Sequence, residues 1–480
     1  MSPRTSGLLD SDDWDEVKSD SSSEWSFTKS YWKPAAAGGR VKNIVNTIRA
    51  GIRARTRPVE NLRPTAYLDG LRGFAALLVY LHHHQLWAHG IVEQDHVFEN
   101  SFGYQGKYHF ATFPFVRHFF SGGHYAVSTF FIISGYVLSL KPLTLIQAGE
   151  HIQLGDVLAS SLFRRWIRLY LPLIFAMILY VTFLHTFGLW TRIMTKQGSW
   201  YDEMWSLYYE FKNFSFVFKV GGEPWLSYNR HLWSIPVEFR GSIVIFTAQM
   251  AFSRCSKNAR LWCETGLIFY FMYIADGSFY AMFVAGMLLC DLDLLASKGD
   301  LPRFLARLEP AKEFIFYHLL IFSLFLGGVP SENDHVEQLA KNRGFYYLSW
   351  FKPQAVYDYK WFYLFYAAVF LVASVPRIFW LKSFFETRFC QYLGHISFSL
   401  YLVHGPMMKN IPHWANKLPL SMSGPLGLEL SVLIPQLILV PLTFGLAHVA
   451  TRFIDTPCVK FAAWFYKKAL GDPMSKQAKA

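Results

Sequence analysis

Long apolar segments recur along the chain, and they constrain its fold more than any other feature. A hydrocarbon core about 30 Å thick is crossed by roughly 20 helical residues, and ten segments approach that length. They lie near residues 67–88, 124–140, 169–189, 232–252, 261–275, 277–295, 313–329, 360–376, 390–407 and 429–451. Because backbone polar groups facing lipid must be satisfied within their own segment, these spans are expected to be helices. We therefore predict an all-α polytopic membrane protein with about ten transmembrane helices.

The composition of the chain agrees with a membrane protein. Charged residues make up 17% of the sequence, below the roughly 25% typical of soluble globular chains. Aromatic residues make up 18%, and such rings concentrate at the interfaces between bilayer and water. This balance excludes a disordered chain and argues against a soluble enzyme.

The net charge of +12 is compatible with a nucleic-acid partner, so its distribution along the chain decides its meaning. With the N-terminus cytoplasmic, segments on the inner side of the membrane carry more than twice as many Lys and Arg residues as the outer loops. Membrane proteins show this bias as the positive-inside rule. We expect a multi-pass integral membrane protein with both termini cytoplasmic, the lipid bilayer as a partner and no nucleic acid.

The chain divides into four segments. Residues 1–28 carry seven acidic residues among serines and lack a signal-peptide pattern, so a disordered cytoplasmic tail is expected. Residues 29–63 are strongly basic with apolar residues on one helical face, which predicts a juxtamembrane amphipathic helix on an anionic leaflet. A basic linker without stable structure is the alternative. Residues 64–455 are expected to form the membrane domain, and residues 456–480 a basic cytoplasmic tail.

The first predicted span carries the most ionisable residues, which are costly inside a bilayer and therefore mark functional candidates. It contains Asp69, Arg72 and three consecutive histidines, His82 to His84. Along a helix, the step from Arg72 to His83 returns to within about 20° of the same face and rises about 16 Å. We expect Arg72 near the cytoplasmic end of a polar stripe and His83 deep in the outer half. In the alternative interpretation, Arg72 extends to the interface and the histidines form an outer polar cap.

Polar residues also lie in or beside later spans. His231 and Glu238 fall on one predicted face of the fourth span, where they form either a structural contact between helices or part of a catalytic site. His404 lies toward the end of the ninth span, and a structural role is the alternative to a functional one. Arg165 and Arg168 lie one turn apart before the third span. They are suited to bind phosphates of an anionic cofactor, or they anchor the cytoplasmic side.

Several other chemistries have no signal in the sequence. No Walker loop, HExxH or GxSxG pattern occurs, which argues against nucleotide hydrolysis, zinc proteolysis and serine hydrolase chemistry. The five cysteines are scattered without metal-ligand spacing. No metal site is expected.

Five motifs in order over about 67–455 resemble the acyltransferase-3 family of integral membrane O-acyltransferases, which use acyl-coenzyme A. They are Asp69-Gly-Leu-Arg-Gly73 followed by His83, Phe130-Phe-Ile-Ile-Ser-Gly-Tyr136, Arg165-x-x-Arg168, Leu232-Trp-Ser-Ile-Pro-Val-Glu-Phe239, and Leu393-Gly-His-Ile-Ser-Phe-Ser-Leu-Tyr-Leu-Val-His404. The Glu238 motif lacks the second acidic residue of many bacterial relatives and resembles fungal members. No C-terminal esterase-like domain follows, so acceptor selection is expected in the membrane domain or in a partner.

The resemblance implies transfer of an acyl group, expected to be acetyl, from acyl-CoA to a hydroxyl of a carbohydrate or small-molecule metabolite. It implies a catalytic set of His83 as the base, Arg72 as its essential partner, and Glu238. It implies acyl-CoA binding by Arg165, Arg168 and Asp69, and acceptor binding by Trp233, Ser134 and His404. Acyl-CoA is the expected donor substrate, and no permanently bound cofactor is expected.

Two alternatives and one mechanistic choice remain open at the level of the sequence. A secondary transporter would use intramembrane charges for coupling, although the paired broken helices of such folds are not visible. The other large class of membrane-bound O-acyltransferases also uses an intramembrane histidine. No activated Ser or Cys nucleophile is evident, which favours direct acyl transfer over an acyl-enzyme.

Overall fold

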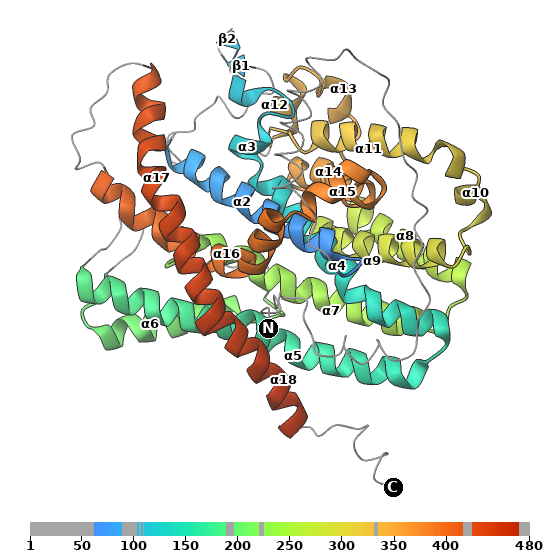
Figure 1. Cartoon of the computed structure of the whole chain (residues 1–480), viewed down its shortest axis with the longest axis horizontal. Helices are drawn as coiled ribbons and strands as arrows, with labels where there is room; N and C mark the ends of the chain where they lie inside the picture. Colours follow the sequence, from blue (N-terminus) through green and yellow to red (C-terminus); the bar gives the residue numbers. More distant parts are fainter. Residues whose placement is uncertain are drawn as a thin grey trace, which may run out of the picture.

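A computed structural model describes residues 62–88, 103–104, 107–108, 110–188, 196–219, 225–330, 335–415 and 425–469 (Figure 1). The predictions made for the acidic tail 1–28, for nearly all of the basic segment 29–63 and for residues 470–480 lie outside the described residues.

Helices form nearly all of the described regular structure. The α-helices are α2 (Ala66–Ala88), α3 (His118–Ser121), α4 (Gly123–Ala148), α5 (His151–Phe187), α6 (Trp200–Phe214), α7 (Ser234–Phe252), α8 (Lys257–Phe269), α9 (Ser278–Ser297), α10 (Arg303–Ala306), α11 (Lys312–Leu326), α12 (Val336–Ala340), α13 (Tyr346–Ser349), α14 (Tyr359–Ser374), α15 (Phe379–Phe385), α16 (Arg388–Ala415), α17 (Pro425–Ala450) and α18 (Thr456–Ala469). Short 3₁₀ turns cover Phe110–Thr112, Arg230–Trp233, Glu309–Ala311 and Val375–Arg377, and π-helical turns cover Tyr270–Ile274 and Thr451–Asp455. One two-residue antiparallel pair joins β1 (Gly103–Tyr104) to β2 (Lys107–Tyr108). The predicted all-α polytopic fold is confirmed.

Each of the ten predicted spans coincides with a helix. Among the described residues, five helical stretches are long and apolar enough to cross a membrane: Gly123–Ala148, His151–Phe187, Ser278–Ser297, Tyr359–Arg377 and Gln436–Lys468. The other predicted spans fall on α2, α7, α8, α11 and α16, which are shorter or richer in polar residues. The count of ten spans therefore stays a prediction.

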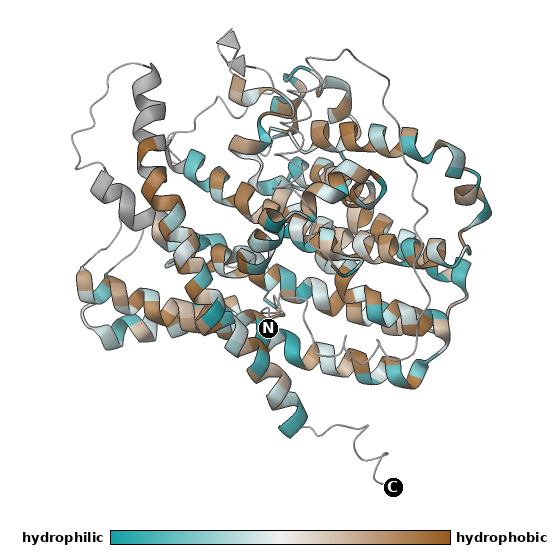
Figure 2. Ribbon diagram, viewed as in Figure 1, coloured by the Kyte–Doolittle hydropathy of each residue, from teal (hydrophilic) through white to brown (hydrophobic). Residues whose placement is uncertain are grey.

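The outer surfaces of the long helices are apolar. Figure 2 shows apolar residues predominating along α5 and along the coloured part of α17, and hydrophilic residues at the end of α18. Exposed side chains on α5 and α17 include Phe175, Ile178, Leu179, Phe183, Leu437, Ile438, Leu442 and Leu446. Water would not favour such surfaces, whereas lipid tails would.

Helix α4 lies at the centre of the bundle and packs against α2, α7, α9 and α14 (Figure 1). Its contact with α9 is close because of two glycines. A Cβ on Gly135 would lie 2.0 Å from the carbonyl oxygen of Phe283, and one on Gly286 would lie 2.1 Å from that of Ile132. In a bilayer the hydrophobic effect does not drive helices together, and small residues allow the close backbone packing that holds them. This crossing fixes the position of Ser134, which directly precedes Gly135 on α4.

The predicted inward loop between the second and third spans is largely helical. Helix α4 continues to Ala148, and α5 begins at His151 after a left-handed turn at Gly149. Because no proline lies between His151 and Arg168, nothing interrupts the backbone hydrogen bonds of this part of α5. Arg165 and Arg168 therefore lie inside a 37-residue helix rather than in a loop.

Candidate active site

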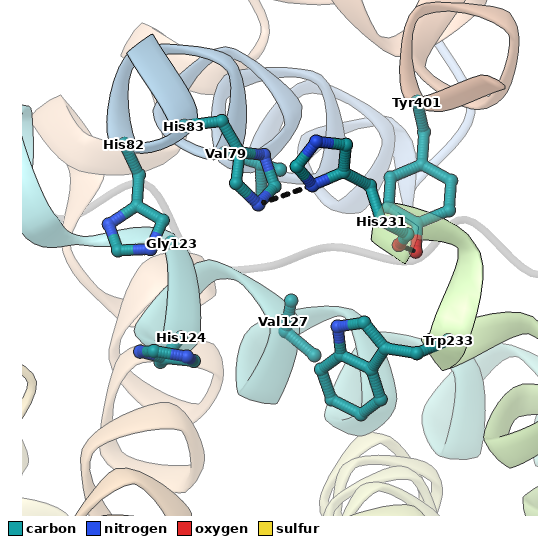
Figure 3. Close-up of a pocket in the computed structure, with 9 residues that line it drawn as sticks. All are labelled: Val79, His82, His83, Gly123, His124, Val127, His231, Trp233 and Tyr401. Atoms are coloured by element: carbon teal, nitrogen blue, oxygen red, sulfur yellow. Dashed lines mark hydrogen bonds between the residues drawn. The ribbon is translucent and has the colours of Figure 1, made fainter. Parts of the chain in front are cut away.

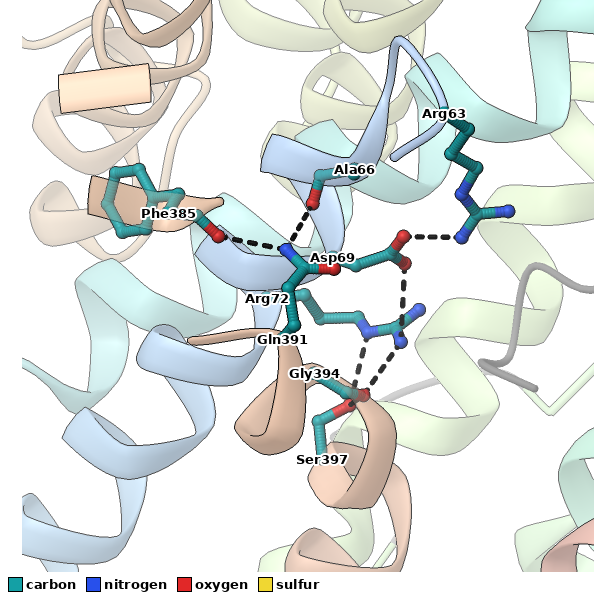
Figure 4. Close-up of polar contacts among 8 residues, drawn as sticks. All are labelled: Arg63, Ala66, Asp69, Arg72, Phe385, Gln391, Gly394 and Ser397. Carbon is teal, nitrogen blue, oxygen red and sulfur yellow. Dashed lines mark hydrogen bonds and ion pairs between the residues drawn. The ribbon is translucent and has the colours of Figure 1, made fainter. Parts of the chain in front are cut away.

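Helices α2 and α16 cross with their backbones in contact, and this crossing positions the polar residues of α2. A Cβ on Gly73 would lie 2.2 Å from the backbone nitrogen of Gly394, so no side chain fits there. Gln391 strengthens the crossing, because its Nε2 donates to the carbonyl oxygens of Ala66 at 2.8 Å and Phe385 at 2.9 Å (Figure 4). Side chains on this face of α2 therefore meet α16 directly.

Arg72 is buried at the α2–α16 crossing, with 8% of its surface exposed. Its Nε donates to Ser397 Oγ at 3.1 Å, and its Nη2 donates to the Gly394 carbonyl oxygen at 2.9 Å. Asp69 lies 3.6 Å away as an ionic partner and also pairs with Arg63 (Figure 4). The side chain of Arg72 therefore points into the helix crossing, and does not extend to the membrane interface as in the alternative interpretation of the sequence.

A second ion pair joins Arg165 on α5 to Glu238 on α7. Arg165 Nη2 lies 2.5 Å from Glu238 Oε1, and its Nε donates to Ser242 Oγ at 2.7 Å. The side chain of Ser134 on α4 also hydrogen bonds to Glu238. The helices α4, α5 and α7 are thus joined around one carboxylate.

The two ion pairs belong to one charged cluster. Arg72 is under the electrostatic influence of Asp69, Glu238 and Asp455, and Arg168 under that of Asp455, Arg165 and Arg72. Asp455 ends the π-helical turn between α17 and α18 and is 7% exposed. We call the group of Asp69, Arg72, Arg165, Arg168, Glu238 and Asp455 the charged cluster.

Three histidines from different elements form a hydrogen-bonded chain, with His83 of α2 in the middle. His83 Nδ1 lies 3.0 Å from His404 Nε2 on α16, and His83 Nε2 lies 3.1 Å from His231 Nδ1 (Figure 3). His404 Nδ1 lies 3.1 Å from the Leu400 carbonyl oxygen. We call His83, His231 and His404 the histidine chain.

A small cavity adjoins the histidine chain (Figure 3). Its volume is about 30 Å³, and it is lined by Val79, His82, His83, Gly123, His124, Val127, His231, Trp233 and Tyr401. This volume holds water molecules or a single hydroxyl group rather than a whole organic substrate. His404 is 1% exposed and is not among the lining residues, because it lies behind His83.

The sequence predicted that Arg72 and His83 share a helical face, and the structure confirms this, because both contact α16. His231 and Glu238 were also predicted to share a face, but they join different partners. His231 lies on the 3₁₀ turn before α7 and contacts His83, whereas Glu238 contacts Arg165.

The site residues predicted from the sequence fall into two groups. The charged cluster contains the predicted residues Asp69, Arg72, Arg165, Arg168 and Glu238, and Ser134 lies beside it. The histidine chain contains the predicted residues His83 and His404, and Trp233 lines the adjoining cavity. Sequence reasoning did not place His124, Tyr401 or Asp455 at a site, because only the tertiary structure brings them near α2.

The histidine chain also has the spacing of a metal site. One nitrogen from each of the three histidines lies within 4.8 Å of the others. Transition metals accept such imidazole ligands. In the described residues, however, both ring nitrogens of His83 are already hydrogen bonded to histidines.

A polytopic helical membrane protein with arginine–carboxylate pairs inside its bundle and a chain of three histidines, one buried and two half-buried, is the class that the fold and site define. The acyltransferase domain of the acyltransferase-3 family matches residues 65–452. The chain belongs to this family, and its enzymatic class is that of an O-acyltransferase. It is an integral membrane protein. Membership favours the enzyme over the transporter and over the other class of membrane-bound O-acyltransferases.

Two fungal proteins are similar over nearly the whole chain. The O-acetyltransferase PaAT-1 of Phomopsis amygdali is 29% identical over 90% of this chain and 90% of its own. The acyltransferase clz18 of Cochliobolus lunatus is 23% identical over 86% of this chain and 98% of its own. No solved structure matches the chain.

Proposed function

We propose that the protein transfers an acetyl group from acetyl-CoA to a hydroxyl of a carbohydrate or small-molecule metabolite. The name of the similar Phomopsis amygdali protein supports acetyl as the group transferred. The charged cluster lies around one part of α2, and the histidine chain lies about 16 Å further along the same helix. This arrangement supports a donor that is anionic at one end and reactive at the other.

The charged cluster suits the phosphates of the donor. Arginine presents a planar fork of donors that matches phosphate oxygens, and Arg165 and Arg168 lie on one face of α5. Glu238 orients Arg165 through their ion pair rather than acting beside His83. Asp69 does the same for Arg72.

His83 suits the general base. The acceptor hydroxyl gives its proton to the imidazole while its oxygen bonds to the acyl carbon. The carbon–sulfur bond then breaks, and the thiolate of CoA receives the proton as it leaves. The rise of about 16 Å between Arg72 and His83 is comparable to the pantetheine arm that joins the phosphates to the thioester. Direct transfer needs no nucleophile from the protein.

The proposed orientation places both termini and the charged cluster on the cytoplasmic side of the membrane. The bias of Lys and Arg toward the predicted inner segments supports it. The lipid bilayer surrounds the apolar faces of α5 and α17.

The observation that carries the proposal is the placement of Arg72 and His83 on one face of α2, both bonded to α16. The test compares His83→Ala and Arg72→Ala in isolated membranes, with labelled acetyl-CoA and a panel of hydroxylated acceptors. Exposed residues of the same type, His318→Ala and Arg254→Ala, serve as controls. Both site variants should lose transfer at normal protein abundance. Transfer at the level of the controls would refute the assignment.

A further inference from the structure

The histidine chain ends on a backbone carbonyl, which fixes the positions of its protons. The Leu400 carbonyl oxygen can only accept, so His404 Nδ1, 3.1 Å away, carries the proton. In the neutral ring, His404 Nε2 is then an acceptor, and His83 Nδ1 must donate to it across 3.0 Å. His83 Nε2 is therefore the nitrogen with the lone pair.

That lone pair lies on the cavity side. His83 lines the cavity, whereas His404 is 1% exposed and lies behind it. His231 Nδ1 approaches His83 Nε2 at 3.1 Å and donates to it. An acceptor hydroxyl entering the cavity would replace His231 at this nitrogen.

The titratable groups that interact with His83 are other histidines, namely His82, His124, His231 and His404. In a serine–histidine–aspartate triad, a carboxylate fixes the tautomer of the base and stabilises its charged form. Among the described residues, no carboxylate is hydrogen bonded to His83, and His404 occupies the corresponding position.

We propose that His404 is a positioning residue that takes the role of the triad carboxylate, and that it does not touch the acceptor. Anchored by Leu400, His404 Nε2 holds the proton on His83 Nδ1 and thereby keeps the reactive lone pair of Nε2 toward the cavity. This inference rests on the proposed function, because it requires His83 to be the base. It reassigns His404, for which the family resemblance implied acceptor binding.

The experiment compares three variants of His404. Gln has an amide oxygen that can accept from His83 Nδ1, Glu has a carboxylate in the same place, and Leu has no acceptor. His404→Leu should lower kcat by about 10² or more with little change in KM for the acceptor. His404→Gln should recover most of kcat. His404→Glu should move the acidic limb of the pH profile to higher pH, because a carboxylate stabilises the protonated base.

Membrane abundance and size-exclusion profiles of each variant separate lost chemistry from lost folding. If His404→Leu is poorly folded, the pH profile of His404→Glu still tests the inference, and an unshifted acidic limb would overturn it. A raised acceptor KM with unchanged kcat, or equal kcat in the Gln and Leu variants, would overturn the inference. One bound metal ion per protein with chelator-sensitive transfer would also overturn it, since His404 Nε2 would then be a ligand. If His83→Ala is fully active, the proposed function itself fails, whereas an inactive His83→Ala with an active His404→Leu removes only this inference.

Discussion

Substituting Gly73 by alanine is expected to disable the enzyme without removing it from the membrane. The added Cβ would lie 2.2 Å from the backbone nitrogen of Gly394, where ordinary contacts begin at 3.4 Å. The helices α2 and α16 must therefore separate locally by about 1 Å. Because the neighbour is backbone rather than a flexible side chain, no rotamer change can relieve the contact.

Two interactions of the proposed site cross the same interface. Arg72 Nη2 lies 2.9 Å from the Gly394 carbonyl oxygen, and His83 Nδ1 lies 3.0 Å from His404 Nε2. A separation of about 1 Å takes both beyond hydrogen-bond distance. Misplacement of that size costs roughly 10²-fold in rate, and overpacking costs about 1–3 kcal/mol of stability.

The assay measures acetyl transfer per mole of protein in membranes, together with the temperature at which the detergent-solubilised protein aggregates. Gly155→Ala on α5 is the matched control, because nothing lies within 4 Å of a Cβ built there. The Gly73 variant should lose about two orders of magnitude in transfer and the control should not. Equal activity and equal stability in the two variants would refute the reasoning that this crossing holds the site.

Three further predictions concern single parts of the site. Glu238→Gln should lower abundance, because it leaves Arg165 buried without its carboxylate at a cost of about 3–5 kcal/mol, and adding Arg165→Gln should restore abundance but not transfer. Arg168→Gln should raise KM for acetyl-CoA and leave KM for acetyl-pantetheine unchanged, which steady-state kinetics with the two donors would check; an equal rise for both would contradict a phosphate role. Trp233→Ala should raise KM for the acceptor and leave KM for acetyl-CoA unchanged, with the exposed Trp262→Ala as control.

Local sequence predicted the elements of the site better than their partners. The period of an α-helix is enough to place Arg72 and His83 on one face, because that relation lies within one helix. The partners Gly394 and His404 lie more than 300 residues away in the chain, and no period connects them. His231 was visible as a polar residue before the fourth span, yet its contact with His83 depends on a 3₁₀ turn that the pattern does not encode.

The separation between the charged cluster and the histidine chain has an electrostatic reason. A guanidinium opposes the positive charge that a general base acquires when it takes a proton. With an effective dielectric constant of about 20, two unit charges 4 Å apart interact by about 4 kcal/mol, whereas at about 16 Å the interaction falls to about 1 kcal/mol. Arg72 and His83 can therefore share one helix face while Arg72 binds charge and His83 accepts a proton. A long donor with phosphates at one end and a thioester at the other is the kind of substrate that makes this separation useful.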